Sequence, residues 1–204
     1  GSYIVGGNFS RVTINGVDTN RKGLARIKAD GTLDMTFPTV NSTNRPSVEA
    51  IVKDDAGRIF IGGDFTSVVV GVTETPRLRV ARLTPVFALD TAFNTSTVGP
   101  DKIVNALATS GDGSVYIGGE FLNIGTTAIR YIAKLNTSGA RDGGFSNTIP
   151  ANETNKYVRS IFRHTDGTLY VGSNVSNWSS SVMPGFNLSS LVKLSASGSR
   201  VSAF

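Results

Sequence analysis

The residues IFIGGDF at positions 59–65 recur along the chain with little change. The same pattern stands at YIVGGNF (3–9), VYIGGEF (115–121) and LYVGSNV (169–175). The copies begin at residues 3, 59, 115 and 169, so their spacings are 56, 56 and 54 residues. Self-similarity at a nearly fixed period of this size indicates a repeat architecture.

Each copy is part of a longer unit. A second apolar run follows at 24–31, 79–86, 131–139 and 191–198, and then a segment at 32–37, 88–93, 140–145 and 199–204 that ends in Phe. A further apolar run precedes the last three copies, at 48–55, 103–110 and 158–165. We name these runs A to D in chain order, with the glycine motif in run B. The chain is then one repeat domain of four units: unit 1 (1–46), unit 2 (47–101), unit 3 (102–156) and unit 4 (157–204).

The runs are short, rich in Val, Ile, Leu, Tyr and Phe, and bounded by Gly, Asp, Asn or Ser, which predicts strands. Four antiparallel strands in about 55 residues are typical of a β-propeller blade. The sequence therefore predicts an all-β propeller of four-stranded blades, with unit 1 lacking run A. Glycine lets a neighbouring backbone approach closely, and a large ring fills the gap between twisted sheets. The expected structural positions are Gly6, Gly7, Phe9, Gly62, Gly63, Phe65, Gly118, Gly119, Phe121, Phe37, Phe93 and Phe145.

The combined pattern, from V-x-A-I through Y-[IV]-GG-[DEN]-F to G-x-x-D-x-x-F, resembles the delta-60 repeat β-propeller family. Residues 48–94 and 102–146 match best, whereas unit 4 departs at Ser173, Val175 and Val201. The resemblance implies a bacterial surface protein or a bacteriophage virion protein. Because the chain begins within the turn between runs A and B and ends on a closing Phe, we expect it to be a piece of a longer array, with a closed four-bladed ring that lacks one strand as the alternative. The expected partners then include the remaining repeats of the parent chain and other virion proteins.

The connections between the runs differ in length, and the long ones are expected to lie on one face of the propeller. Those after run B (10–23, 66–78, 122–130, 174–190) and after run D (38–47, 94–102, 146–157) are long, whereas the others are tight turns. In a propeller blade the long connections open on one face, named here the loop face, and the tight turns open on the opposite turn face. Binding residues are often carried by long loops on a rigid scaffold, so we expect the site on the loop face.

The longest connection holds the only tryptophan, Trp178. An exposed indole among short polar side chains would suit stacking against a sugar. The alternative is that Trp178 folds back and caps its own blade. The candidate ligand-binding residues are Trp178, Asn177, Phe186, Asn187 and Met183, and the expected ligand is a host cell-surface polysaccharide.

Several classes of chemistry lack their usual residues. There is no cysteine, and the single histidine, His164, precedes a tight turn on the turn face, so neither a zinc site nor a hydrolytic triad is expected. The formal net charge of +5 is scattered along the chain, which argues against nucleic-acid binding. No apolar run approaches the ~18 residues of a membrane span. We expect a non-enzymatic recognition or structural domain without cofactor, located in a virion or at a cell surface.

Repeated acids leave one enzyme alternative open. Acids recur in run B (Asp64, Glu120) and in run D (Asp34, Asp90, Asp142). We expect them to bond turn backbones or to pair with the run C cations Arg26, Arg82 and Lys134. A glycan-cleaving enzyme would need two carboxylates on the loop face. Its candidates are Glu74, Asp101 and Glu153. A secreted or cell-surface bacterial propeller that binds proteins is the other alternative.

Overall fold

A computed structural model describes residues 1–43, 46–147, 149–176, 178 and 191–201. These residues form antiparallel strands and turns and contain no helix. Units 2, 3 and 4 each hold a three-stranded sheet in which run B is the central strand. The sheets are β6 (Ser47–Lys53), β7 (Ile59–Asp64) and β10 (Val80–Leu83); β11 (Val104–Thr109), β12 (Val115–Gly119) and β15 (Ile132–Leu135); and β16 (Val158–Arg163), β17 (Leu169–Ser173) and β18 (Leu191–Leu194).

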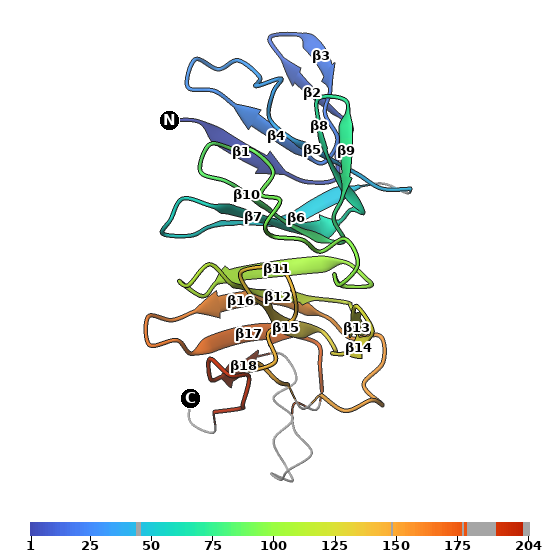
Figure 1. The fold of residues 1–204 in the computed structure, drawn as a ribbon, viewed down its shortest axis with the longest axis vertical. Helices are drawn as coiled ribbons and strands as arrows, with labels where there is room; N and C mark the ends of the chain where they lie inside the picture. Colours follow the sequence, from blue (N-terminus) through green and yellow to red (C-terminus); the bar gives the residue numbers. More distant parts are fainter. Residues whose placement is uncertain (44–45, 148, 177, 179–190, 202–204) are drawn as a thin grey trace.

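Unit 1 holds a two-stranded sheet of β1 (Tyr3–Gly6) and β4 (Leu24–Ile27). The four sheets are stacked along the long axis of the molecule, with the N-terminus at one end and the C-terminal unit at the other (Figure 1). Contacts between β6 and β11 and between β11 and β16 join successive sheets through their run A strands. The prediction of an all-β array of repeated antiparallel sheets is confirmed.

The prediction that run D adds a strand to the sheet of each unit is wrong for the residues that the structure describes. Within the described part of each unit, run D contributes a single bridge to run C: Ile27 with Leu33, Leu83 with Leu89, Leu135 with Arg141 and Leu194 with Arg200. The aspartate that follows this bridge explains why pairing stops in the first three units. The Oδ1 atom of Asp90 accepts a hydrogen bond from the Ala92 amide at 3.0 Å, and Asp34 and Asp142 do the same two residues on. Such turns offer the backbone an alternative to the ladder and bend the chain away.

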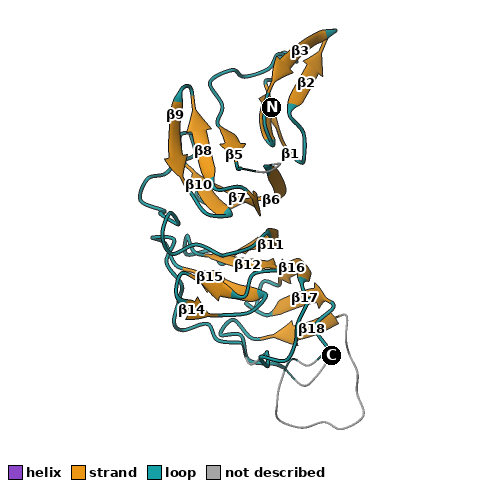
Figure 2. Ribbon diagram, turned by 90° about the vertical axis from the view of Figure 1, so that its right-hand side faces the viewer, coloured by secondary structure: helices purple, strands orange, loops and turns teal. Residues whose placement is uncertain are grey.

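The long connections contain strands that the run pattern does not predict. After run B lie the hairpins β2 (Arg11–Ile14) with β3 (Val17–Asn20), β8 (Ser67–Val70) with β9 (Thr73–Pro76), and β13 (Asn123–Ile124) with β14 (Thr127–Ala128). The connection after run D of unit 1 adds β5 (Thr39–Asn41), which pairs with β8 of unit 2. Figure 2 shows β5, β8 and β9 as a small sheet beside the main stack. On the loop face, the pairing of β5 with β8 therefore links unit 1 to unit 2.

The hydrophobic core consists of three clusters, each shared by two successive units. One cluster combines Phe60, Val80 and Phe93 of unit 2 with Val104 and Ile117 of unit 3, among others. The other two join unit 1 to unit 2 and unit 3 to unit 4 in the same way. Successive residues of a strand point to opposite faces, so the central strands β7 and β12 each contribute to two clusters. The stack is held together by the same apolar residues that fold each unit.

The first glycine of each GG pair lies where the next unit packs. A Cβ atom on Gly62 would stand 2.8 Å from Val104 Cγ1, and Gly6 has the same relation to Val48 of unit 2. In units 2 and 3 the second glycine, Gly63 or Gly119, lies against the backbone of its own run A strand, at a β-bulge that falls between Val104 and Ala106 in unit 3. The expectation of close backbone approach is confirmed at these positions, because a side chain would meet the neighbouring strand or unit.

The closing phenylalanines fill the spaces between units, as expected. Phe37, Phe93 and Phe145 are buried, and each belongs to a cluster that spans two units. The Phe37 ring packs edge-to-face against Phe87 of unit 2 with centroids 5.8 Å apart. Phe204, the fourth member, lies outside the described residues.

The expected pairing of run D acids with run C cations is also confirmed. The distances are 2.8 Å from Arg26 Nη1 to Asp34, 2.8 Å from Arg82 Nε to Asp90, and 3.3 Å from Lys134 Nζ to Asp142. Each pair lies beside an aromatic ring at the edge of an inter-unit cluster, as Arg82 does over Phe93 at 4.9 Å. The repeated acids are therefore part of the architecture of the units.

Candidate functional site

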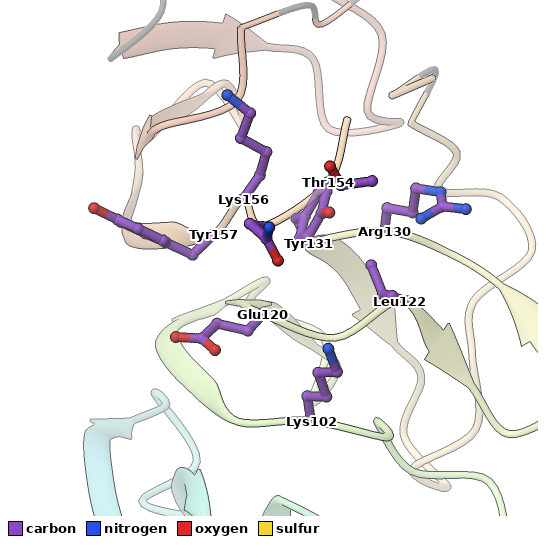
Figure 3. Close-up of a pocket in the computed structure, with 9 residues that line it drawn as sticks. Lys102, Glu120, Leu122, Arg130, Tyr131, Thr154, Lys156 and Tyr157 are labelled. Atoms are coloured by element: carbon purple, nitrogen blue, oxygen red, sulfur yellow. The ribbon is translucent and has the colours of Figure 1, made fainter. Parts of the chain in front are cut away.

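A pocket of about 370 Å³ opens on the loop face between units 3 and 4. One wall comes from unit 3, where Lys102 precedes β11, Glu120 and Leu122 follow β12, and Arg130 precedes β15. The other wall is the segment 154–157 that leads into β16. Figure 3 shows Glu120 and Lys102 on one side of the pocket and Thr154, Lys156 and Tyr157 on the other. Side chains far apart in the sequence thus meet where two repeat units join.

The floor of the pocket is fixed by Tyr131. This residue is buried, and its hydroxyl donates a 2.7 Å hydrogen bond to the carbonyl oxygen of Glu153. Its backbone has a φ of 66°, a conformation that non-glycine residues rarely adopt. The amide of Tyr131 bonds to Phe121 O, and the Gly119 amide bonds to Tyr131 O. These bonds hold the strained residue in place and tie unit 3 to the segment entering unit 4.

One cation of the pocket is neutralised and two are not. Lys156 Nζ lies 3.7 Å from Glu153 Oε2 and donates a 2.8 Å hydrogen bond to Ser176. Within the described part of the chain, Lys102 and Arg130 form no salt bridge, and neither does Glu120. The pocket therefore presents two cations and one carboxylate that are free to bind a ligand.

The corresponding place between units 2 and 3 contains an ion pair. Arg79 occupies the position of Tyr131, with a φ of 63° and the same two backbone hydrogen bonds. Its Nε atom lies 3.3 Å from Oδ1 of Asp64, the counterpart of Glu120. Replacement of this arginine by Tyr131 leaves Glu120 without its internal partner. The unpaired run B acid at this pocket is thus a local departure from the repeat.

The family model for a domain of unknown function (DUF5122) beta-propeller matches residues 1–37, 57–93 and 111–145. Each matched segment ends on a closing phenylalanine and contains the run B glycines, and together they make up more than half of the chain. The chain belongs to this DUF5122 β-propeller family. The predicted propeller repeat is thereby confirmed. A comparison with curated proteins finds no match.

This DUF5122 propeller does not present Trp178 in the way that sugar stacking would require. Trp178 is only 5% exposed and packs in the cluster between units 3 and 4, with Val171 and Val175. An indole buried to this extent offers no ring face for sugar stacking, so its position fits the alternative in which it caps its own unit. The other four candidates, Asn177, Met183, Phe186 and Asn187, lie outside the described residues.

The loop-face acids of the enzyme alternative all have structural partners. Glu74 accepts hydrogen bonds from Ser67 and Asn41, and Glu153 accepts one from the Ser176 amide at 3.0 Å. Asp101 binds the hairpin β13–β14. His164, on the turn face, is half exposed and pairs with Asp166 at 3.1 Å. Among the described residues no three His, Asp or Glu side chains gather where they could hold a metal, and no helix could cross a membrane.

Asp101 fastens the connection into unit 3 to the adjacent hairpin. It accepts hydrogen bonds from the Leu122 and Asn123 amides at 2.9 and 3.1 Å and from Asn123 Nδ2 at 2.8 Å. Burial raises the pKa of the Asp101 carboxyl, but the bonds from Asn123 and Leu122 outweigh it and leave the pKa below its ordinary value. This bonding keeps Lys102 and Leu122, two pocket residues, on rigid backbone.

Because the folded-state pKa of Asp101 is lowered, its stabilisation is present above the unfolded value of about 3.9 and is lost as pH falls through the folded value. We expect Asp101→Asn to lower the free energy of unfolding at pH 7 by roughly 1 kcal/mol, since partial exposure weakens these bonds. The difference from the parent should shrink below pH 3. Urea titrations across this range measure it, with exposed Asp55→Asn as control; a difference that grows toward acid pH would contradict this account.

The pocket residues Lys102, Glu120, Arg130, Lys156 and Tyr157 are not among the candidates drawn from the sequence. A signal exists in the alignment of the units, where the residue before run C changes from Arg79 to Tyr131. In unit 2 the run B acid Asp64 has Arg79 as its neighbour, whereas in unit 3 the acid Glu120 has Tyr131 at that position. The exchange points to a binding site only once the structure has shown that Arg79 contacts Asp64.

Proposed function

We propose that this propeller is a non-enzymatic recognition domain that binds a host surface glycan through its loop face. The observation that carries the proposal is the pocket between units 3 and 4, which combines free charged groups with a half-buried aromatic residue, Tyr157. Glycan sites use such convergent polar groups beside an aromatic surface. The opposite face consists of tight turns whose polar groups bond one another, as Asp30 does with Thr32.

The biological setting that we propose is a bacteriophage tail fibre or a related virion protein. It rests on the resemblance of the repeat to the delta-60 family, and a secreted or cell-surface bacterial propeller remains the alternative. The two settings share the fold and the loop face. They differ in partner, because the bacterial alternative would bind proteins rather than glycans.

We also propose that a further repeat unit packs on the outer face of β1. Tyr3 is 73% exposed there, whereas the corresponding Val115 of unit 3 is fully buried against unit 2. An added unit would cover Tyr3 and Val5 in the way that unit 2 covers β12. The intact mass of the protein from its natural source tests this. A mass well above 21.5 kDa with additional repeats is expected, and an unchanged mass would contradict it.

The absence of cysteine allows a direct test of the loop face. Thr154 lies at the pocket and Thr137 on a turn-face loop, and both are exposed. Each is replaced by cysteine in a separate variant and coupled to the same bulky maleimide. On an array of bacterial surface glycans, we expect the Thr154 conjugate to lose binding by about tenfold or more, because the label fills the pocket.

The Thr137 conjugate should bind as the unlabelled protein does. Equal binding by both conjugates would exclude this part of the loop face as the site. Incubation of the protein with any glycan it binds should release no new reducing ends. Release would favour the glycan-cleaving alternative over binding alone.

A further inference from the structure

The unpaired charges of the pocket indicate what kind of glycan it accepts. Lys156 is balanced by Glu153, so the charge available to a ligand comes from Lys102, Arg130 and Glu120. Two cations against one carboxylate leave the pocket with a net positive charge. A neutral sugar would leave both cations without a counter-charge in a partly enclosed site, whereas an anionic group would form charge-assisted hydrogen bonds with them.

The arrangement also separates the charges. Lys102 and Glu120 project from the unit 3 wall and form no salt bridge with each other. Arg130 lies farther along that wall (Figure 3). A ligand that joined these groups must carry an anion toward the cations and hydrogen-bond donors toward Glu120. A saccharide acid has both, because its carboxylate is attached to a ring bearing hydroxyls.

The site between units 2 and 3 serves as an internal comparison. There Arg79 Nε lies 3.3 Å from Asp64 Oδ1 in an ion pair, and the residue equivalent to Arg130 is Leu78. Between units 3 and 4, the change to Tyr131 frees the acid and the change to Arg130 adds a cation. Both departures from the repeat alter the same pocket in the direction that a polar, anionic ligand requires.

We propose that the pocket between units 3 and 4 binds an acidic saccharide, with anionic groups of the sugar at Lys102 and at Arg130 and sugar hydroxyls at Glu120. This inference rests on the proposed function and specifies its ligand class. The Tyr157 side chain borders the site, and the Arg159 guanidinium lies 5.0 Å from its ring centroid, which orients the ring and adds positive potential nearby.

The test compares one polysaccharide in two chemical forms. Fragments of a uronic-acid-containing bacterial capsule are used either intact or after carbodiimide and borohydride reduction of the carboxylates to neutral alcohols. Isothermal titration with the whole chain should show binding of the intact form and at least about tenfold weaker binding of the reduced form. The affinity for the intact form should also fall as salt rises.

Variants identify the pocket cations. Lys102→Gln and Arg130→Gln should each weaken binding of the acidic form by about fivefold to tenfold and should leave binding of the reduced form unchanged. Exposed Lys28, on a turn-face loop, is the matched control, and Lys28→Gln should change neither. Unchanged thermal melting of all three variants shows that they are folded.

The outcomes separate the two proposals. Preference for the acidic form that both pocket variants reduce supports the inference. Equal binding of the acidic and reduced forms overturns the inference and leaves glycan recognition intact. Binding of neither these forms nor any glycan on the array overturns both.

Discussion

Replacing Gly62 with valine should lower the free energy of unfolding by about 3 kcal/mol. The Cβ atom alone would stand 2.8 Å from Val104 Cγ1 and 3.2 Å from Leu107 Cδ2, and Val104 is fully buried. Val104 is β-branched and has few alternative rotamers, so it cannot move aside without shifting its strand. Equilibrium urea unfolding, followed by circular dichroism, measures the loss.

A paired substitution tests whether the cause is the contact between units. Gly62→Ala and Val104→Ala should each destabilise the protein, the first by crowding and the second by leaving a cavity. The double variant should recover at least about 1 kcal/mol relative to the sum of the two losses. Gly7→Ala is the control, because its Cβ would approach nothing closer than Phe9 at 3.3 Å. Strict additivity of the two substitutions would mean that Gly62 is required for another reason.

Phe93→Ala should cost about 3–4 kcal/mol of stability. The ring is fully buried between units 2 and 3, packs edge-to-face on Phe60 with centroids 5.5 Å apart, and lies under the Arg82 guanidinium. Its removal leaves a cavity and withdraws the packing that supports the Arg82–Asp90 ion pair. Thermal and urea unfolding both report the change.

Phe162 provides the matched control for Phe93. It belongs to β16 and is 62% exposed, so Phe162→Ala should change the free energy of unfolding by no more than about 0.5 kcal/mol. If Phe93→Ala were as mild as Phe162→Ala, the closing phenylalanine would not be the wedge between units that its position indicates.

Much of the fold is predictable from the repeat alone. Runs A, B and C form strands because each run has enough apolar residues, in a regular enough pattern, to build a sheet. The pairing of Asp90 with Arg82 is predictable because both residues recur in register from unit to unit. The point at which run D stops pairing is not predictable, because the apolar pattern of run D resembles that of a strand. The pairing stops at the turn in which Asp90 accepts a hydrogen bond from the Ala92 amide.

The hairpins on the loop face escape prediction for a different reason. Their segments vary in length from unit to unit, so the repeat gives no register for them. Asn15-Gly16 is nevertheless a strong local hairpin signal, and both residues have the positive φ that this turn requires. In this stretch, local turn chemistry is more informative than the comparison of units.

The candidate site is the least predictable part of the molecule. Trp178 stands out in the sequence because it is the only tryptophan, yet its ring is buried. The pocket depends on charged residues from three separate connections, and no single stretch marks them as a group. Their proximity arises from the stacking of unit 4 on unit 3, which depends on packing across the whole interface.

The most direct test of loop-face recognition is to map the bound surface by NMR with an acidic oligosaccharide. In amide spectra of the labelled protein, the account predicts that shift changes cluster at Lys102, Glu120, Leu122, Arg130 and 154–157. Amides of the turn-face loops at 54–57, 84–88 and 136–140 should not move. Changes confined to those loops, with none around the pocket, would contradict the central claim.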